Sequence, residues 1–316
     1  MKAVSLKRMK DLETKLIDTF PTIDFVFTKG VSEIDQKDQQ DLDIIFGYDG
    51  KMDQSFLENC PNLKWIAWYS TGVNSLPLEY IDEQNILLTN GKGVHAKQMS
   101  EFIIAYILDD YKKMRTSYIN QQNKYYDSKL TGVRVSGETI LFLGTGSIAQ
   151  YTANIANAMN MEVIGINKSG HTVDGFSKTY ALNDLPNIIG EADIIVNTLP
   201  ETEQTIHLLS NEHFKLMDET SLFINVGRGT IAEEKVIVEA LKTEEIRHAY
   251  LDVFEKEPLD KHSELYTLDN VTITAHITGN DRENMSEVTD IFINNLNSIL
   301  NKNDIIENEV DPKQGY

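Results

Sequence analysis

Short apolar runs alternate with longer amphipathic stretches along most of this chain, a pattern typical of α/β domains built on parallel sheets. The runs that predict strands in the N-terminal part are Phe25–Phe27, Ile44–Phe46, Trp65–Trp68 and Ile86–Leu88. Polar segments with helical spacing separate several of these runs. We therefore expect a small α/β unit with a parallel sheet at the start of the chain.

The alternation is stronger between Thr139 and Thr278, where the pattern predicts further strands. These are Thr139–Leu143, Glu162–Asn167, Asp193–Asn197, Ser221–Asn225, Ala249–Val253 and Val271–Thr274. Helical stretches lie between most of them, and strands joined by crossover helices form a doubly wound sheet. A long helix is predicted to begin near Ala96 and to run towards Tyr111, and a last amphipathic helix covers about Arg282–Leu300.

That last helix lies too far along the chain to belong to the core of the second sheet, so we expect it to return to the N-terminal unit. The predicted fold is therefore α/β: a Rossmann-type, doubly wound parallel-sheet domain inserted in a second, smaller, flavodoxin-like α/β domain. Residues 98–281 are assigned to the dinucleotide-binding Rossmann domain. Residues 1–97 and 282–316 are assigned to the discontinuous substrate-binding (catalytic) domain.

Composition and charge narrow the possible functions. The 316 residues suit two domains, and the sequence holds no unbroken apolar segment long enough to span a membrane. A net charge of −20 argues against nucleic acid as a partner, although a few local cations still suffice to bind a small anion. The sequence has a single cysteine, Cys60, so an internal disulfide is excluded, and this fits a protein of the reducing cytosol. No other metal-binding residue is spaced around Cys60 as in a metal site. We therefore predict a cytoplasmic protein without a metal site.

The segment Thr139–Ala149 is the most informative stretch of the chain. An apolar strand runs directly into Gly-x-Gly-x-x-Ala, and a helical apolar pattern follows. Gly144 permits a tight turn, and Gly146 lets the backbone N–H groups at the start of the helix approach a pyrophosphate. The small Ala149 lets the helix pack closely on the strand. This order of elements predicts a dinucleotide site.

Four further segments follow predicted strands, where an open α/β sheet places its binding crevice. They are Tyr69–Val73, Asn225–Gly229, Leu251–Leu259 and Ile273–Gly279. They supply a glycine turn, an arginine between two glycines, acidic side chains and a histidine. Taken one at a time, each residue is better explained by structure than by catalysis. As a set, they are the groups that hydride transfer to a 2-oxo acid requires.

With these motifs in this order, the chain resembles the D-isomer-specific 2-hydroxyacid dehydrogenase family. The resemblance runs from about Asn62 to Asp281 and is carried by seven segments. They are Pro61–Trp65, Ser70–Val73, Gly144–Ala149, Thr198–Thr202, Asn225–Gly229, Leu251–Phe254 with Glu257–Leu259, and His276. The residues before this region resemble the family only in their pattern.

The resemblance implies a role for each matching residue. Arg228 binds the carboxylate and carbonyl of the substrate, His276 is the acid/base, and Glu257, directly before Pro258, is the partner of the histidine. The backbone of Thr71 and Gly72 corresponds to the carboxylate site of the family. The chemistry agrees, because a protonated histidine supplies the proton and an arginine stabilises the negative charge that develops on the carbonyl oxygen.

The resemblance also implies a set of cofactor contacts. These fall on Gly144, Gly146, Ser147, Ile148, Asn167, Lys168, Ser169, Leu199, Pro200, Val226 and Asp252, with Asp252 facing the nicotinamide amide. The NAD enzymes of the family carry an acid at the end of the second nucleotide-domain strand, where this chain reads Asn167-Lys168-Ser169. We therefore predict that NADP(H) is favoured and NAD(H) possible. The segment after His276 also lacks the usual paired glycines of the family.

The predicted activity is hydride transfer from NAD(P)H to C2 of a small 2-oxo acid, of the glyoxylate/hydroxypyruvate type, giving the D-2-hydroxy acid. D-lactate dehydrogenase and phosphoglycerate dehydrogenase of the same family are alternatives, and so is a nucleotide-sensing binding protein without turnover. We also predict a homodimer, because the helix from Ala96 carries Phe102, Ile103, Tyr106, Ile107 and Tyr111, more apolar surface than one domain face usually hides.

Overall fold

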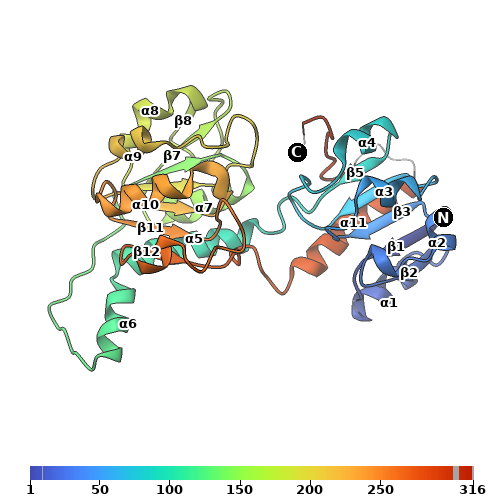
Figure 1. Ribbon diagram of the computed structural model, residues 1–316, viewed down its shortest axis with the longest axis horizontal. Coiled ribbons are helices and arrows are strands. Elements are labelled where there is room, and N and C mark those ends of the chain that lie inside the picture. The colour runs from blue at the N-terminus through green and yellow to red at the C-terminus, as the bar shows by residue number, and fades with distance from the viewer. Residues whose placement is uncertain (9, 302–305, 315–316) are drawn as a thin grey trace. The chain divides into compact units, whose positions relative to one another are not determined.

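The computed structural model describes residues 1–8, 10–301 and 306–314. The chain divides into two compact units (Figure 1). The discontinuous unit comprises Met1–Val94 and Arg282–Tyr316, and the inserted unit comprises His95–Asp281. The first division lies between Val94 and His95, directly before a helix that begins at Ala96 and packs on the inserted sheet. It is slightly earlier than the predicted boundary after residue 97.

The discontinuous unit has a five-stranded parallel sheet in the order β2-β1-β3-β4-β5, the flavodoxin-like order. Its strands are β1 (Lys2–Ser5), β2 (Asp24–Phe27), β3 (Ile44–Gly47), β4 (Trp65–Trp68) and β5 (Leu87–Thr89). Its helices are α1 (Lys10–Thr19), α2 (Gln36–Gln40), α3 (Gln54–Glu58), α4 (Leu78–Glu83), α11 (Asn284–Leu300) and the 3₁₀ turn η1 (Val31–Glu33).

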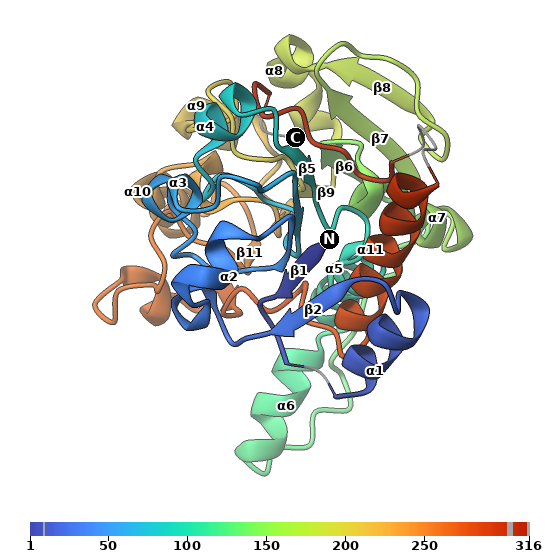
Figure 2. The ribbon, with the colours of Figure 1, turned by 90° about the vertical axis from the view of Figure 1, so that its right-hand side faces the viewer.

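Helices cover both faces of this first sheet. On one face, α1 and α11 bury their apolar sides against alternate strand residues. Figure 2 shows these two helices side by side. At their centre the ring of Phe292 stacks on Phe46 and on Trp65, with centroids 4.4 and 5.0 Å away. The last long helix of the chain therefore completes the core of a sheet whose strands all come from the N-terminal part.

The inserted unit has a seven-stranded parallel sheet in the order β12-β11-β10-β9-β6-β7-β8. Its strands are β6 (Thr139–Leu143), β7 (Glu162–Asn167), β8 (Lys178–Ala181), β9 (Ile194–Asn197), β10 (Leu222–Asn225), β11 (His248–Leu251) and β12 (Val271–Ile273). Its α-helices are α5 (Ala96–Tyr111), α6 (Met114–Gln122), α7 (Ser147–Ala158), α8 (Leu185–Ile188), α9 (Asn211–Leu216) and α10 (Glu234–Lys242). Its 3₁₀ turns are η2 (Leu182–Asp184), η3 (Ile189–Glu191), η4 (Gly229–Ile231) and η5 (Glu264–Thr267).

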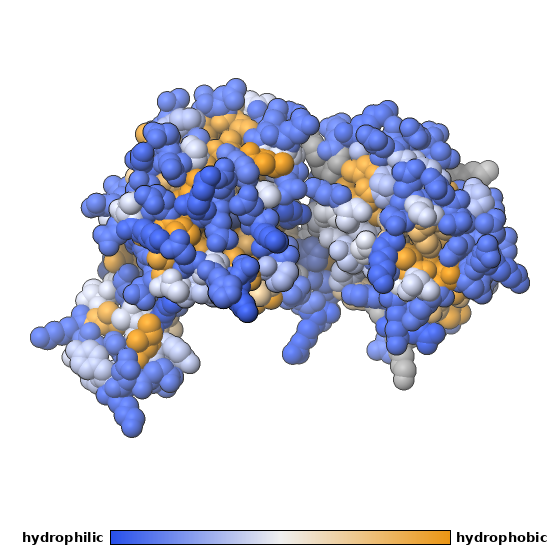
Figure 3. All heavy atoms as spheres, in the orientation of Figure 1, coloured by the Kyte–Doolittle hydropathy of each residue, from blue (hydrophilic) through white to orange (hydrophobic). Residues whose placement is uncertain are grey.

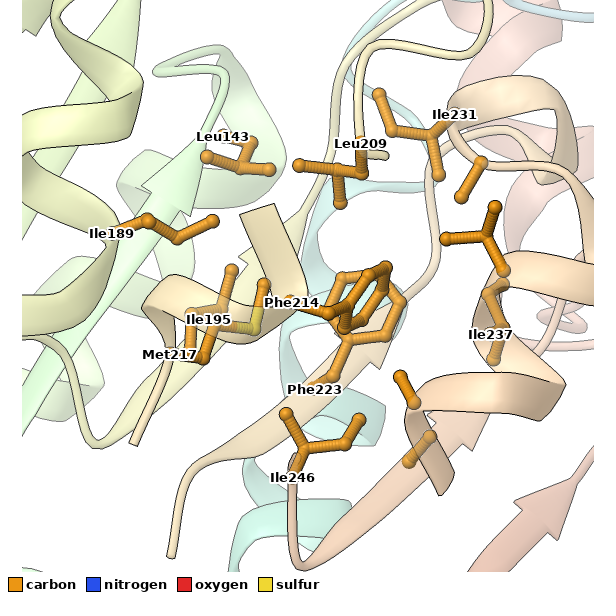
Figure 4. Close-up of a cluster of buried hydrophobic side chains, with 14 of the residues drawn as sticks. Leu143, Ile189, Ile195, Leu209, Phe214, Met217, Phe223, Ile231, Ile237 and Ile246 are labelled. Atoms are coloured by element: carbon orange, nitrogen blue, oxygen red, sulfur yellow. The ribbon is translucent and has the colours of Figure 1, made fainter. Parts of the chain in front are cut away.

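Two apolar layers hold the inserted unit together. Helices α5 and α7 pack on one face of the sheet, and α8, α9 and α10 pack on the other. Figure 4 shows the second layer, in which Phe214 of α9 meets Phe223 of β10 edge to face at 5.5 Å. The strand order reverses between β6 and β9, and in such sheets ligands bind at the carboxyl ends of the strands that flank this switch point. The predicted fold class is confirmed.

The apolar residues of α5 are mostly covered within the inserted unit. Ile103, Tyr106, Ile107 and Tyr111 are buried in the layer that α5 shares with α7, and Phe102 packs against it. They do not form the free apolar surface that the sequence pattern suggested. Exposed apolar side chains lie instead on α6 and on the segment that follows it, which extend from the body of this unit (Figure 1). They are Met114, Tyr118, Ile119, Tyr125, Tyr126 and Val133, and we call this set the α6 arm.

Within the part of the chain that the structure describes, no helix has the length and apolar character needed to cross a membrane.

Candidate active site

The glycine turn between β6 and α7 has the shape expected of a phosphate-binding turn. Gly144 has a φ of +96°, and a Cβ there would lie 2.9 Å from Oγ1 of Thr198, so only glycine fits. At Gly146, the N-cap of α7, a Cβ would meet no atom within 4 Å. Ser147 and Ile148 begin α7, and the N–H groups of the first turn of a helix have no acceptor within the helix. The residues present therefore fit the pyrophosphate of a dinucleotide.

Two buried asparagines organise the strand ends beside this turn. Nδ2 of Asn197 donates to Oδ1 of Asn225 at 2.9 Å, and both side chains are fully buried. Oδ1 of Asn197 accepts from the N–H of Leu199 at 3.2 Å, and Nδ2 of Asn225 donates to the carbonyl of Arg228 at 3.1 Å. The pair thus couples the loops after β9 and β10. Sequence reasoning gave these residues no role, although an asparagine at the end of two predicted apolar strands was a usable signal.

The predicted cofactor contacts on these loops differ in exposure. Leu199 is half-buried and Pro200 is exposed, whereas Val226 is almost fully buried against the layer of α5. A Cβ on Gly227 would lie 2.8 Å from the carbonyl oxygen of Leu199, so the two loops are in close contact.

Arg228 is half-buried at the carboxyl edge of β10, and its Nη1 donates to the carbonyl of Gly227 at 2.8 Å. Among the described residues its guanidinium makes no ion pair. On the following Gly229, a Cβ would overlap the backbone carbonyl of Phe254, so the arginine loop and the loop after β11 are in direct contact. The arginine is therefore a positioned cation with donors left for an anionic ligand.

His276 and Glu257 form an ion pair at the next strand ends. Nδ1 of His276 lies 2.7 Å from Oε2 of Glu257, and Oε1 of Glu257 accepts from the N–H of Phe254 at 3.0 Å. The histidine side chain is 54% exposed, which leaves Nε2 accessible to a substrate. The other nearby acid, Glu255, lies 3.0 Å from Nε2 of His207 and also accepts from the N–H of Glu234. The structure therefore brings Glu257, and not Glu255, to the histidine.

Asp252 holds the loop that carries His276. The carbonyl of Asp252 accepts from the N–H of His276 at 2.8 Å. Its fully buried carboxylate accepts four hydrogen bonds: two at Oδ1, from Oγ1 of Thr274 and the N–H of Ile277, and two at Oδ2, from the N–H and Oγ1 of Thr278. These bonds occupy the acceptor positions of a carboxylate. His276 itself has a φ of +52°, a left-handed conformation that is costly for a residue with a side chain.

In the discontinuous unit, the loop after β4 has the form of an anion-binding loop. The carbonyl oxygens of Ser70, Thr71 and Gly72 accept from the N–H of Gly91, Nδ2 of Asn90 and Nε1 of Trp68. The N–H groups of Thr71 and Gly72 have no acceptor among the residues that the structure describes. A loop with its carbonyls paired and its N–H groups free favours a negatively charged ligand.

At the end of β7, Asn167 is turned into its own loop. Its Nδ2 donates to the carbonyl of His171 at 2.8 Å, and its Oδ1 accepts from the N–H groups of Ser169 and Gly170 at 3.3 and 2.8 Å. Asn167 is buried, whereas Lys168 and Ser169 are exposed. Of the three predicted cofactor contacts at this strand end, Asn167 therefore shapes the turn, whereas Lys168 and Ser169 present polar groups to solvent.

A partly buried polar cluster lies at the opposite, amino ends of the strands. Nε2 of His248, the first residue of β11, lies 2.9 Å from Oγ1 of Thr272, and burial lowers the pKa of His248 to about 4. Arg115 of α6 donates to the carbonyl of Val271 and to Thr272, at 2.8 and 2.6 Å. Because this cluster is at the far edge of the sheet, it is a structural element that anchors the start of α6.

Comparison with known proteins agrees with this geometry. Residues 104–278 match the model of the D-isomer specific 2-hydroxyacid dehydrogenase NAD binding domain. The chain is 30% identical over 270 residues to a glyoxylate/hydroxypyruvate reductase B of Enterobacter sp. (strain 638), covering 82% of this chain and 83% of that protein. It is 29% identical over 249 residues to a glyoxylate reductase of Pyrococcus furiosus, covering 75% and 74% of the two chains. A crystal structure of a D-isomer specific 2-hydroxyacid dehydrogenase family protein from Aeromonas salmonicida superposes with a TM-score of 0.87 at 26% identity, over 98% of this chain and 99% of that one.

Proposed function

Since this chain belongs to the D-isomer-specific 2-hydroxyacid dehydrogenase family and is an NAD(P)-dependent oxidoreductase, we propose that its substrates are small 2-oxo acids of the glyoxylate/hydroxypyruvate type. The observation that carries the proposal is the short contact between His276 and Glu257, with Arg228 on the adjoining loop, where its guanidinium makes no ion pair among the described residues. The product is the D-2-hydroxy acid.

In this proposal each residue acts at a stated atom. The bound nicotinamide supplies the hydride that adds to C2 of the 2-oxo acid. Glu257 holds Nδ1 of His276, so the ring donates its proton from Nε2 to the carbonyl oxygen. Arg228 stabilises the negative charge that develops on the same oxygen and binds the carboxylate through its planar fork. The family resemblance assigns carboxylate binding also to the N–H groups of Thr71 and Gly72, which have no acceptor among the described residues.

We further propose NADP(H) as the favoured cofactor, with NAD(H) also accepted. No carboxylate follows β7, where it would repel the 2′-phosphate, and Lys168 and Ser169 offer a cation and a hydroxyl donor there. Since a charge-assisted hydrogen bond is worth about 1.5–3 kcal/mol, the preference should be roughly tenfold to hundredfold.

A substrate panel tests the activity. Oxidation of NADPH and of NADH is followed with glyoxylate, hydroxypyruvate and pyruvate. The highest kcat/KM should come with NADPH and one of the first two acids. A higher value with pyruvate would instead favour D-lactate dehydrogenase. Binding of cofactor without turnover of any acid would favour a nucleotide-sensing role. An Asn167→Asp variant should move the cofactor ratio towards NADH.

We propose a homodimer that uses the α6 arm. Tyr126 is 91% exposed, and the other apolar residues of the arm lie within the same short segment. Some of these apolar side chains are visible on the protruding part of the inserted unit in Figure 3. Clustered exposed apolar side chains mark interaction surfaces, and a second copy of the chain is the occupant that the family resemblance favours. Light scattering at micromolar concentration should give a dimer mass, and Ile119→Lys should reduce it to the monomer mass. A monomer mass for the unaltered protein would refute the proposal.

We also propose a cytoplasmic location and no nucleic-acid partner. The single buried thiol, Cys60, suits a reducing compartment, and a net charge of −20 repels a phosphate backbone.

A further inference from the structure

The turn after β7 presents one polar side chain that has so far been given no role. Asn167 is occupied within the turn, so the groups available to a ligand at this strand end are those of Lys168, Ser169 and His171, all exposed. His171 follows a glycine four positions after the end of the strand. Its position is therefore set by the turn and not by the strand itself.

The backbone of this turn is firmly held. The carbonyl of His171 accepts from Nδ2 of Asn167 and from Oγ1 of Thr179, both at 2.8 Å. Gly170 has a φ of +73°, and a Cβ there would lie 2.9 Å from the N–H nitrogen of Ala181 in β8. The turn is thus tied to β7 at one end and to β8 at the other, and His171 starts from a fixed backbone.

The ring of His171 is also oriented. Oγ of Ser169 lies 3.1 Å from Nδ1 of His171, which leaves Nε2 as the polar atom of the ring without a partner among the described residues. The ammonium group of Lys168 likewise makes no ion pair within the described part of the chain. Two basic side chains with free donors therefore share one turn of a strongly acidic protein.

We propose that His171, through Nε2, is a second cationic ligand of the 2′-phosphate of NADP(H), beside Lys168. This inference rests on the proposed NADP(H) preference and deepens it. A phosphate accepts several hydrogen bonds, and contacts to a charged donor are stronger than contacts to a neutral one. Ser169 then has two tasks, because its hydroxyl orients the ring as well as facing the ligand.

The proposal makes the cofactor preference depend on pH. The ionisable groups on β7, the turn and β8, together with the 3₁₀ turn that follows, are Glu162, Lys168, His171, Asp174, Lys178, Tyr180 and Asp184. Histidine is the residue type among them whose ordinary pKa lies near neutral pH. A bound phosphate raises the pKa of a contacting histidine. The gain in NADP⁺ affinity is therefore complete below the pKa of the free histidine and is lost as pH rises through its pKa in the complex.

Calorimetric binding of NADP⁺ and NAD⁺ to the whole protein tests this without requiring turnover. The two conditions are about pH 6.5, where a phosphate monoester with a second pKa near 6 is still largely dianionic, and about pH 8.5. The ratio of the NAD⁺ to the NADP⁺ dissociation constant should fall roughly five- to tenfold between them, the difference between a charged and a neutral donor. NAD⁺ affinity itself should change little.

Three variants isolate the histidine. In His171→Gln, the ratio of the NAD⁺ to the NADP⁺ dissociation constant should be as low at pH 6.5 as at pH 8.5. In His171→Lys, it should stay at pH 8.5 as high as the unaltered protein shows at pH 6.5. Lys178→Gln is the control, because it also removes one positive charge but at a residue away from the turn. Lys178 begins β8 and is the register partner of Ile164 in β7. This variant should retain the pH dependence of the unaltered protein. A ratio that is independent of pH in the unaltered protein, or equally pH-dependent in His171→Gln, would overturn the role of His171 while leaving the NADP(H) preference intact. Equal affinity for NAD⁺ and NADP⁺ at pH 6.5 and at pH 8.5 would overturn the role of His171 and the NADP(H) preference together. The proposed reduction of 2-oxo acids is tested separately, by the substrate panel.

Discussion

Replacing Asp252 with asparagine should uncouple the loop of the catalytic histidine from β11. The aspartate accepts four hydrogen bonds from the segment 274–278, two at each oxygen. Asparagine offers a single carbonyl oxygen and turns an NH₂ group towards the remaining donors. With the oxygen in the position of Oδ1, the amide faces the N–H and hydroxyl of Thr278.

The magnitude follows from these contacts. The hydroxyl of Thr278 can rotate to accept from the new amide, but the N–H of Thr278, which lies 3.1 Å from Oδ2, cannot. A buried donor left without a partner costs about 1–3 kcal/mol, and replacing charge-assisted bonds by neutral ones adds about 1 kcal/mol. We therefore expect the free energy of unfolding of the inserted unit to fall by roughly 2–4 kcal/mol. The left-handed backbone of His276 is released at the same time, so kcat should fall as well.

Urea unfolding and steady-state kinetics measure the two effects together. Thr278→Val is the matched control, because it removes one hydroxyl donor and leaves the carboxylate with three bonds. This control should lower the free energy of unfolding by about 1 kcal/mol and leave kcat nearly unchanged. If Asp252→Asn instead raises KM for the cofactor while stability stays within about 0.5 kcal/mol, the role implied by the family, a contact with the nicotinamide amide, is correct and the reasoning from the loop fails.

Three further changes have equally definite outcomes. His276→Ala should lower turnover by roughly 10²–10⁴-fold with cofactor affinity unchanged, because it removes only proton transfer, and near-normal turnover at neutral pH would contradict the assignment. Arg228→Lys should raise KM for the oxo acid about tenfold or more, since an ammonium cannot form the bidentate contact; unchanged affinity would exclude that contact. His248, whose pKa burial lowers to about 4, is neutral in the folded protein, so the unfolded state binds the extra proton below pH 6.5. Stability should therefore fall by at most about 3 kcal/mol as pH drops from 6.5 to 4, and His248→Gln should flatten this part of the urea-derived stability curve.

Strands with continuous apolar runs could be predicted from the sequence, and strands without them could not. β6 and β10 are buried on both faces by helices, so nearly every residue is apolar and the pattern is plain. β8 is an edge strand with half-exposed residues, and β1 has only Ala3 and Val4 as apolar residues. β1 nevertheless lies between β2 and β3 in the sheet. Its strand conformation depends on hydrogen bonds to these two neighbours, which the residues of β1 alone do not reveal.

The sequence predicted which segments end at one edge of the inserted sheet, but it did not predict the contacts between them. Motifs at strand ends predicted which residues share an edge, because the carboxyl ends of parallel strands lie together. The hydrogen bond that Thr278 donates to Asp252 and the one between the two buried asparagines join segments more than twenty residues apart, so they depend on the packed loops. The apolar residues of α5 were misleading for a related reason. The helix is covered by both the sheet and α7, and counting apolar side chains along one segment does not reveal how many neighbours cover it.

The way in which one unit is inserted in the other has a consequence for the newly synthesised chain. The inserted unit begins and ends at adjacent points, with Nδ1 of His95 2.9 Å from the carbonyl of Gly279, so all of its sequence has been made by the time Asp281 is added. The discontinuous unit started earlier but still lacks α11, whose Phe292 fills the space between Phe46 and Trp65. We therefore expect the inserted unit to complete its fold on the ribosome before the discontinuous unit does. Until α11 has been made, the apolar face of the first sheet that carries Phe46 and Trp65 lacks the helix that covers it in the finished protein.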